Sequence, residues 1–191
     1  MPDRLVLLVG TRKGAFIVES DAARTQWSVR NSSHMGQNVM HMNYDSRTGT
    51  TLAAVGDPWF GSRVYRSNDL GQTWNEPQVG ITFPADSGRS LEKIWHVTPG
   101  RADEPGVLYA GVEPAALFKS TDNGQTWDFV PSLEAHPTRA EWQPALVASA
   151  CTPSSSTPAT RSTCTWASPP PASSASQASM SACTRCGEIP N

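Results

Sequence analysis

Seven side chains of mixed chemistry are the candidates for ligand contact in this chain of 191 residues. They comprise an arginine–lysine pair, two histidines, two tryptophans and a glutamate: Arg12, Lys13, His41, Trp59, Trp95, His96 and Glu113. Arginine binds carboxylates through paired hydrogen bonds, and aromatic faces stack on flat or cyclic groups. We therefore expect a small polar or sugar-like ligand, or a partner protein.

Each candidate also has a structural alternative. Trp59 and the adjacent Phe60 equally fit packing between repeated units, and the scattered histidines fit hydrogen-bonded or surface positions. Arg12 and Lys13 equally fit a solvated turn. The residue types alone leave these alternatives open.

No catalytic set and no metal site can be assigned. Glycoside hydrolysis generally needs two carboxylates, or a tyrosine nucleophile with a carboxylate partner, and the spacing of the three tyrosines defines no such pair. A structural zinc site needs a second ligand pair besides Cys183-Thr-Arg-Cys186, and the other cysteines stand alone. We expect no catalytic residue, no metal and no cofactor.

The composition excludes two classes of partner. Fifteen basic and 17 acidic side chains give a net charge of −2, so there is no basic surplus to attract nucleic acid or an anionic membrane. The apolar run from Leu5 to Val9 is too short for a signal peptide or a membrane span. We therefore expect a cytoplasmic protein.

The same composition favours an all-β protein. Charged residues make up only 17% of the chain, whereas it holds 16 prolines and 7 tryptophans. Few long charged helix formers and many aromatic and turn residues are typical of short strands joined by tight turns.

An internal repeat organises the first three quarters of the chain. Ser67–Trp74 and Ser120–Trp127 both read S-x-D-x-G-Q-T-W, and a degenerate copy near the N-terminus ends at Trp27. The tryptophans are 47 and 53 residues apart by subtraction of their numbers. A period of about 50 residues with several short strands per unit is typical of β-propellers.

The repeated motif has a mechanical interpretation. An aspartate in a bend accepts backbone N–H groups, and glycine supplies a positive φ. The tryptophan then covers the turn and buries a large ring. We assign this structural role to the serine, aspartate, glycine and tryptophan of both copies: Ser67, Asp69, Gly71, Trp74, Ser120, Asp122, Gly124 and Trp127.

The motif resembles the Asp-box, or BNR repeat, of sialidases and sortilin-type receptors. The phrases VGTRKGAF, DPWFGSRVYRSNDLGQTW and LYAGVEPAALFKSTDNGQTW resemble a bacterial BNR branch often labelled glycosyl hydrolase. The resemblance covers residues 1–144 and implies an incomplete β-propeller of about three four-stranded blades. The early F/Y-R-I-P motif of sialidases has no match here, because its nearest counterpart is Thr11-Arg12-Lys13-Gly14.

Two functions from different classes follow from this resemblance. The first is a non-catalytic binding or scaffold module. The second is a glycoside hydrolase of exo-sialidase type, whose remaining blades and catalytic groups lie outside this chain. A fold alone does not decide between them.

The composition changes abruptly after residue 144. Serine, alanine, proline and threonine fill 32 of the 47 positions from 145 to 191, by count. Such a segment suits a disordered tail. It also suits a frameshift, because each TCN serine codon read one base out encodes Phe, Leu, Ile or Val. Read in that frame, Trp166 gives the glycine expected about 55 residues after Gly111.

We therefore interpret residues 145–191 as a frameshifted continuation into a fourth blade, with a base lost or gained near Ala145–Val147. A fan of three blades would expose apolar faces and strand edges to water. Self-association is expected if the chain is truncated in this way.

Overall fold

The computed structural model describes residues 5–139, which form ten strands and two short 3₁₀ helices. Sheet 1 comprises β1 (Val6–Thr11), β2 (Gly14–Ser20) and β3 (Trp27–Ser33). Sheet 2 comprises β4 (Asn38–Asp45), β5 (Thr50–Asp57) and β6 (Gly61–Ser67). Sheet 3 comprises β7 (Lys93–Pro99), β8 (Leu108–Glu113), β9 (Ala116–Ser120) and β10 (Asp128–Phe129). The helices are η1 (Ala85–Ser87) and η2 (Pro131–Leu133). The proposed tail and its frameshift lie outside the described residues.

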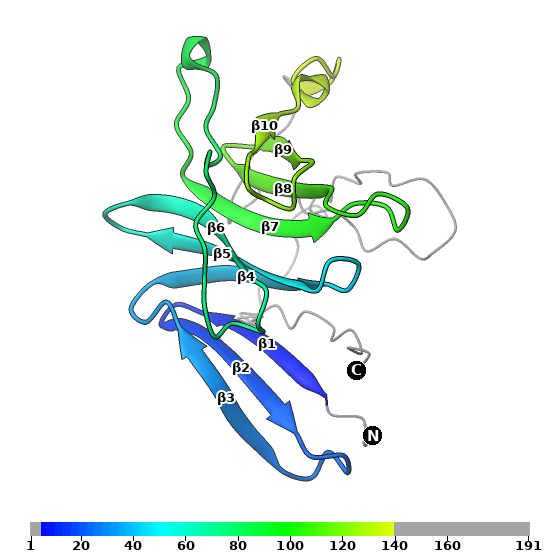
Figure 1. Ribbon diagram of the computed structural model, residues 1–191. Helices are drawn as coiled ribbons and strands as arrows, with labels where there is room; N and C mark the ends of the chain where they lie inside the picture. Colours follow the sequence, from blue (N-terminus) through cyan, green and yellow to red (C-terminus); the bar gives the residue numbers. More distant parts are fainter. Residues whose placement is uncertain (1–4, 140–191) are drawn as a thin grey trace, which may run out of the picture.

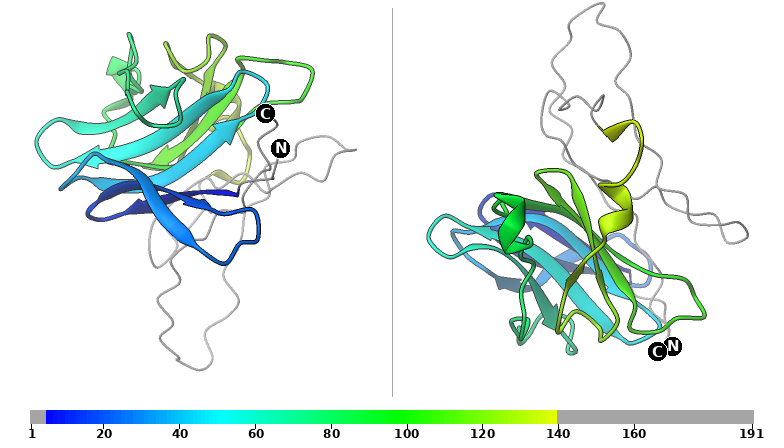
Figure 2. Two further views of the ribbon diagram at one scale, coloured as in Figure 1. Left: turned by 60° about the horizontal axis from the view of Figure 1, so that its bottom comes forward. Right: turned by 90° about the horizontal axis from the view of Figure 1, so that it is seen from above.

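Each sheet is an antiparallel meander in which strands adjacent in the chain pair with one another. The three sheets lie one above another in chain order (Figure 1). Sheet 2 packs against sheet 1 on one face and against sheet 3 on the other, and Figure 2 shows the same three sheets from two further sides. Residues 5–139 thus form an all-β, incomplete β-propeller of three sheets.

The number of strands per sheet differs from a uniform four. Sheet 3 has four strands, whereas sheet 2 has three and a single bridge between Arg66 and Asn75 at the place of a fourth. Pro77 follows two residues later and has no N–H to continue the ladder, which explains why that strand stops. Sheet 1 also has three strands within residues 5–139, in the order β1, β2 and β3. Strand β3 is the outer one.

Two apolar clusters join the sheets. One lies between sheets 1 and 2 and includes Ile17, Val39 and Val55. The other lies between sheets 2 and 3 and includes Leu52 and Phe118. Alternate residues of β5 belong to different clusters because successive side chains of a strand point to opposite faces. The continuous apolar run in β5 therefore marks a strand buried on both faces.

The Ser67–Trp74 turn is held by its own polar side chains. The Asp69 carboxylate accepts the Thr73 N–H at 2.9 Å and the Thr73 hydroxyl at 2.6 Å, while Ser67 Oγ donates to Asp69 Oδ1 at 2.7 Å. These bonds, that of the Thr73 hydroxyl first, lower the pKa of Asp69 to about 2. The Ser67 hydroxyl oxygen also accepts the Gly71 N–H at 2.6 Å.

Both the backbone conformation and the available space require glycine at position 71. Its φ is +77°, which disfavours residues with a Cβ. A Cβ there would also lie 2.4 Å from Ile17 Cδ1 in sheet 1 and 3.2 Å from Trp74 Cζ2. The turn of sheet 2 therefore packs directly on sheet 1, with the Trp74 ring beside it.

The Ser120–Trp127 turn repeats this geometry in sheet 3. Asp122 accepts the Thr126 N–H at 2.9 Å and the Thr126 hydroxyl at 2.6 Å. Ser120 Oγ donates to Asp122 at 2.8 Å and accepts the Gly124 N–H at 2.8 Å. Trp127 is buried at 5% exposure, whereas Trp74 is only partly buried.

A third turn of related chemistry lies at the end of β2, where sequence reasoning had identified only the degenerate copy ending at Trp27. Asp21 accepts the Thr25 N–H and the Thr25 hydroxyl, both at 2.7 Å. The threonine lies four residues after the aspartate, as it does after Asp69 and Asp122. Trp27 follows this threonine by two residues rather than one. A shift of one residue turns a strand side chain to the other face, and Trp27 is 44% exposed.

Candidate functional site

The strand registers divide the molecule into two ends. The β1–β2, β5–β6 and β8–β9 turns lie at one end, together with the linker 34–37; we call this the Trp59 end, at the left of Figure 1. The two S-x-D-x-G-Q-T-W turns and the β4–β5 turn lie at the opposite end, which we call the Asp69 end. Five of the seven candidate residues lie on strand termini or turns of the Trp59 end: Arg12, Lys13, Trp59, Trp95 and Glu113.

The β5–β6 turn presents two aromatic side chains to solvent. Trp59 is 86% exposed and Phe60 is 71% exposed, so neither packs between sheets as the structural alternative required. Their backbone is fixed nonetheless, since Asp57 Oδ1 accepts the Trp59 N–H at 2.7 Å and the Phe60 N–H at 2.9 Å. Gln37 donates to the other carboxylate oxygen at 2.5 Å.

These hydrogen bonds, with that from Gln37 first, lower the pKa of Asp57. The carboxylate thus accepts three hydrogen bonds at the hairpin tip. Two exposed aromatic side chains are carried on this hydrogen-bonded turn.

Trp95 and Glu113 meet beside Lys93. Glu113 Oε2 accepts the Trp95 Nε1–H at 3.2 Å and pairs with Lys93 Nζ at 3.0 Å. The Lys93 ammonium also lies 5.2 Å from the centre of the Trp95 ring. Lys93 was absent from the sequence-based set, although its pairing with Glu113 follows from the β7–β8 register. A ligand at this cluster would meet a charged pair and one indole.

Arg12 and Lys13 form the tip of the β1–β2 turn, and both side chains are exposed. The Lys13 carbonyl accepts the Gly36 N–H at 3.0 Å, which links this turn to the linker 34–37. Met35 of that linker is 63% exposed. The Trp59 end thus carries basic, thioether and aromatic side chains on neighbouring turns.

His41 and His96 lie elsewhere, on the first strands of sheets 2 and 3. Their ring centres are 3.9 Å apart, and His41 is only 8% exposed. The Val97 N–H donates to His41 Nδ1 at 3.3 Å, so the neutral ring carries its proton on Nε2. These histidines bring the first strands of sheets 2 and 3 into contact.

Burial keeps both histidines neutral. It lowers the pKa of His41 to about 3, with His96 as a smaller cause, and the pKa of His96 to about 4. Protonation of His41 would also break its bond from Val97, because Nδ1 would then be a donor.

Stability should therefore fall as the pH drops below 6.5. In this range the unfolded histidines bind protons and the folded ones do not, and each contributes a slope of up to about 1.4 kcal/mol per pH unit. The stabilising carboxylate Asp69 titrates lower, with a pKa of about 2. Urea unfolding at pH 7, 6 and 5 should show a shallower slope for His41→Gln than for the unchanged chain. Equal slopes would contradict this account of the pair.

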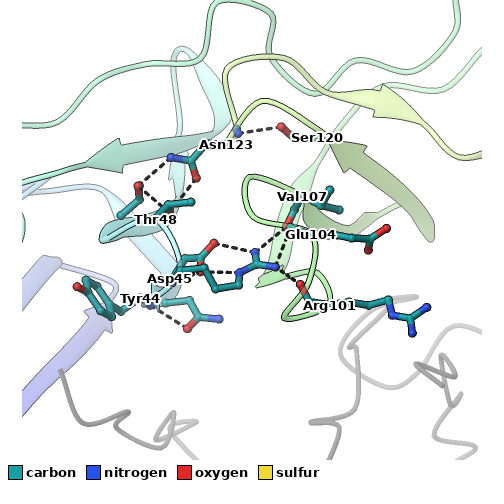
Figure 3. Close-up of polar contacts among 12 residues, drawn as sticks. Tyr44, Asp45, Thr48, Arg101, Glu104, Val107, Ser120 and Asn123 are labelled. Carbon is teal, nitrogen blue, oxygen red and sulfur yellow. Dashed lines mark hydrogen bonds and ion pairs between the residues drawn. The ribbon is translucent and has the colours of Figure 1, made fainter. Parts of the chain in front are cut away.

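The Asp69 end holds a polar cluster that sequence reasoning missed (Figure 3). Arg47 donates to both oxygens of Asp45, at 2.8 and 2.7 Å. The same guanidinium donates to the carbonyls of Glu104 and Val107, both at 2.9 Å, and to that of Arg101. One side chain of sheet 2 thereby satisfies three carbonyls in the β7–β8 loop of sheet 3.

Asn123 extends this contact between sheets. Its amide donates to Thr50 Oγ1 at 2.8 Å, from within the Ser120–Trp127 turn (Figure 3). The Asp69 end is therefore occupied by hydrogen bonds that fix one sheet on the next, which leaves the Trp59 end as the candidate binding surface.

Residues 5–139 hold neither a cluster of metal-ligating side chains nor a long apolar helix. No group of three or more histidine, cysteine, aspartate or glutamate side chains is placed to hold a metal ion there. In the same range, no helix is long and apolar enough to cross a membrane.

Comparisons with known proteins find similarity over part of the chain. No model of a known protein family matches the chain. A xyloglucanase from a Paenibacillus species is 28% identical over 163 residues, covering 68% of this chain but 15% of the xyloglucanase. Among solved structures, YCF48 bound to D1 peptide matches 68% of this chain and 36% of that chain, with 16% identity and a TM-score of 0.44. YCF48 from Cyanidioschyzon merolae matches 68% and 38%, with 15% identity and a TM-score of 0.39. The chain thus spans well under half the length of each.

Proposed function

We propose that the chain is a non-catalytic binding part of a β-propeller of the BNR/Asp-box type, and that it binds a sugar-like ligand at the Trp59 end. The observation that carries this proposal is the ordered β5–β6 turn, which holds Trp59 and Phe60 in solvent. Two neighbouring exposed rings form a contiguous apolar patch, and such patches, unlike single exposed residues, mark interaction sites.

The chemistry of the surface favours a saccharide over an extended peptide. Saccharides combine apolar ring faces with many hydroxyl groups, and they suit flat aromatic side chains beside charged hydrogen-bonding groups. Trp59 and Phe60 supply the aromatic faces, and Arg12 and Lys13 supply exposed donors. The similarity to a xyloglucanase makes xyloglucan oligosaccharides the first probe.

The binding role is favoured over catalysis because two carboxylates near this surface, Asp57 and Glu113, are already engaged. Asp57 is held by three donors, and Glu113 is paired with Lys93 and Trp95. A glycosidase needs one carboxyl group as an acid and a second as a base or nucleophile. The hydrolase alternative is favoured by the xyloglucanase match, and it requires that missing blades supply these groups.

Trp59→Ala should weaken binding of xyloglucan oligosaccharides at least tenfold, or about 1.4 kcal/mol, since it removes the most exposed ring. Isothermal titration calorimetry measures this change directly. Trp27→Ala is the matched control, because Trp27 is exposed but lies at the Asp69 end, and its affinity should be unchanged.

Three outcomes would overturn the proposal. The unchanged chain could fail to bind any saccharide of a panel, Trp59→Ala could bind as tightly as Trp27→Ala, or the chain could release reducing sugar ends. The last result would support the hydrolase alternative. Binding to a peptide at the same turn, with none to saccharides, would identify a protein-binding module instead.

A further inference from the structure

The contact between sheets 1 and 2 is repeated between sheets 2 and 3. Strand β2 ends at Ser20, and strand β6 ends at Ser67. The residues three positions before these serines are Ile17 and Val64. Ile17 packs toward sheet 2, and Val64 packs toward sheet 3. Equivalent positions therefore make equivalent contacts with the following sheet.

The same count from Ser120 gives Leu117 in sheet 3. Leu117 lies opposite Gly111 in the β8–β9 register, on the face away from Phe118, and Tyr109 lies on that face too. Phe118 is fully buried against sheet 2, whereas Leu117 and Tyr109 are partly exposed. We call the surface formed by Tyr109 and Leu117 the leading face.

Sheet 1 presents the complementary surface. Val9 lies directly before Gly10, and Ala110 holds the same place before Gly111. Val18 lies two residues before Ser20, and Phe118 lies two residues before Ser120. Ala110 and Phe118 are 0% exposed because sheet 2 covers them. In sheet 1, Val9 is 38% exposed and Val29, paired with Val18, is 62% exposed. We call the surface formed by Val9, Val18 and Val29 the trailing face.

We propose that the leading face of one copy of this chain binds the trailing face of a second copy, head to tail. The two faces occupy the positions that already pack together between sheets 1 and 2 and between sheets 2 and 3. Such an interface would therefore repeat, between two molecules, the contact that joins sheet 1 to sheet 2 and sheet 2 to sheet 3 within each molecule. Two different faces meet, so the contact is heterologous, and copies close a ring or add in a row.

Sheet edges support the same arrangement. Strand β5 is covered by β4 along one edge, and β8 is covered by β7. Within residues 5–139 the equivalent strand β1 pairs with β2 alone. An edge strand of this kind offers backbone groups for pairing with another chain.

The test uses the full 191-residue chain in sedimentation velocity over a hundredfold range of concentration. The unchanged chain should assemble as its concentration rises. Val9→Lys and Leu117→Lys should each sediment as a monomer, because each places a charge in one of the two faces. Val79→Lys is the matched control, since Val79 is 55% exposed and belongs to neither face, and it should assemble normally.

Mixing the two monomeric variants is the decisive step. Val9→Lys keeps an intact leading face, and Leu117→Lys keeps an intact trailing face, so an equimolar mixture should form a 1:1 complex. Circular dichroism establishes that each variant is folded before mixing. A monomeric unchanged chain, normal assembly of Val9→Lys, or no complex between two folded variants would overturn the proposal.

Discussion

Replacing Arg47 with alanine should lower the free energy of unfolding by about 3–5 kcal/mol, the range for breaking a buried ion pair by removing one partner. The Asp45 side chain is only 1% exposed and would lose the guanidinium that pairs with its carboxylate. Three loop carbonyls, those of Arg101, Glu104 and Val107, would lose their donor as well. Urea denaturation followed by far-ultraviolet circular dichroism measures the change.

The matched control is Arg101→Ala. Its side chain is 69% exposed, and its partner Asp103 is 76% exposed, so the pair is a surface contact. Exposed ion pairs contribute about 0–1 kcal/mol. Equal effects of the two substitutions would show that Arg47 does not hold sheet 2 on sheet 3.

Trp127→Ala should also lower the free energy of unfolding by about 3–5 kcal/mol, as for other large aromatic residues removed from a core. Trp127 is 5% exposed and belongs to the cluster between sheets 2 and 3. Its loss would leave a cavity beneath the Ser120–Trp127 turn, and urea denaturation measures the destabilisation.

Trp27→Ala is the control for this prediction, because Trp27 ends the degenerate copy of the same motif. It is 44% exposed, so its removal should cost well under half as much. If both variants were destabilised equally, the tryptophan would act through the turn itself and not through burial against the neighbouring sheet.

The repeat made much of the fold predictable. The spacing of Trp27, Trp74 and Trp127 predicts three units, and three sheets are present. The residue types of Asp69 and Asp122 predict carboxylates that accept N–H groups within their own turns. Local hydrogen bonds of this kind depend on residues at most a few positions apart, and a sequence shows them directly.

The contacts between sheets could not be predicted in this way. Arg47 lies 60 residues before Val107, and no local pattern indicates that its guanidinium reaches that carbonyl. His41 and His96 were expected among ligand-contacting groups, and no sequence pattern indicated that their ring centres lie 3.9 Å apart between two sheets. Such pairs depend on how one sheet rotates on the next, which composition and period do not specify.

The candidate site was predictable in part. The sequence identified Trp59 and left its exposure open between ligand contact and packing. Asp57 and Gln37 fix the backbone of the turn that carries the exposed ring. That constraint joins residues 20 positions apart, so only the folded chain shows it.

The most direct measurement is hydrogen–deuterium exchange of the full chain with and without xyloglucan oligosaccharides. We predict slower exchange in the turns of the Trp59 end, at residues 11–14, 34–37 and 57–61, and no change at 67–74 or 120–127. Protection confined to the Asp69 end would contradict the division of the molecule into a binding end and a structural end.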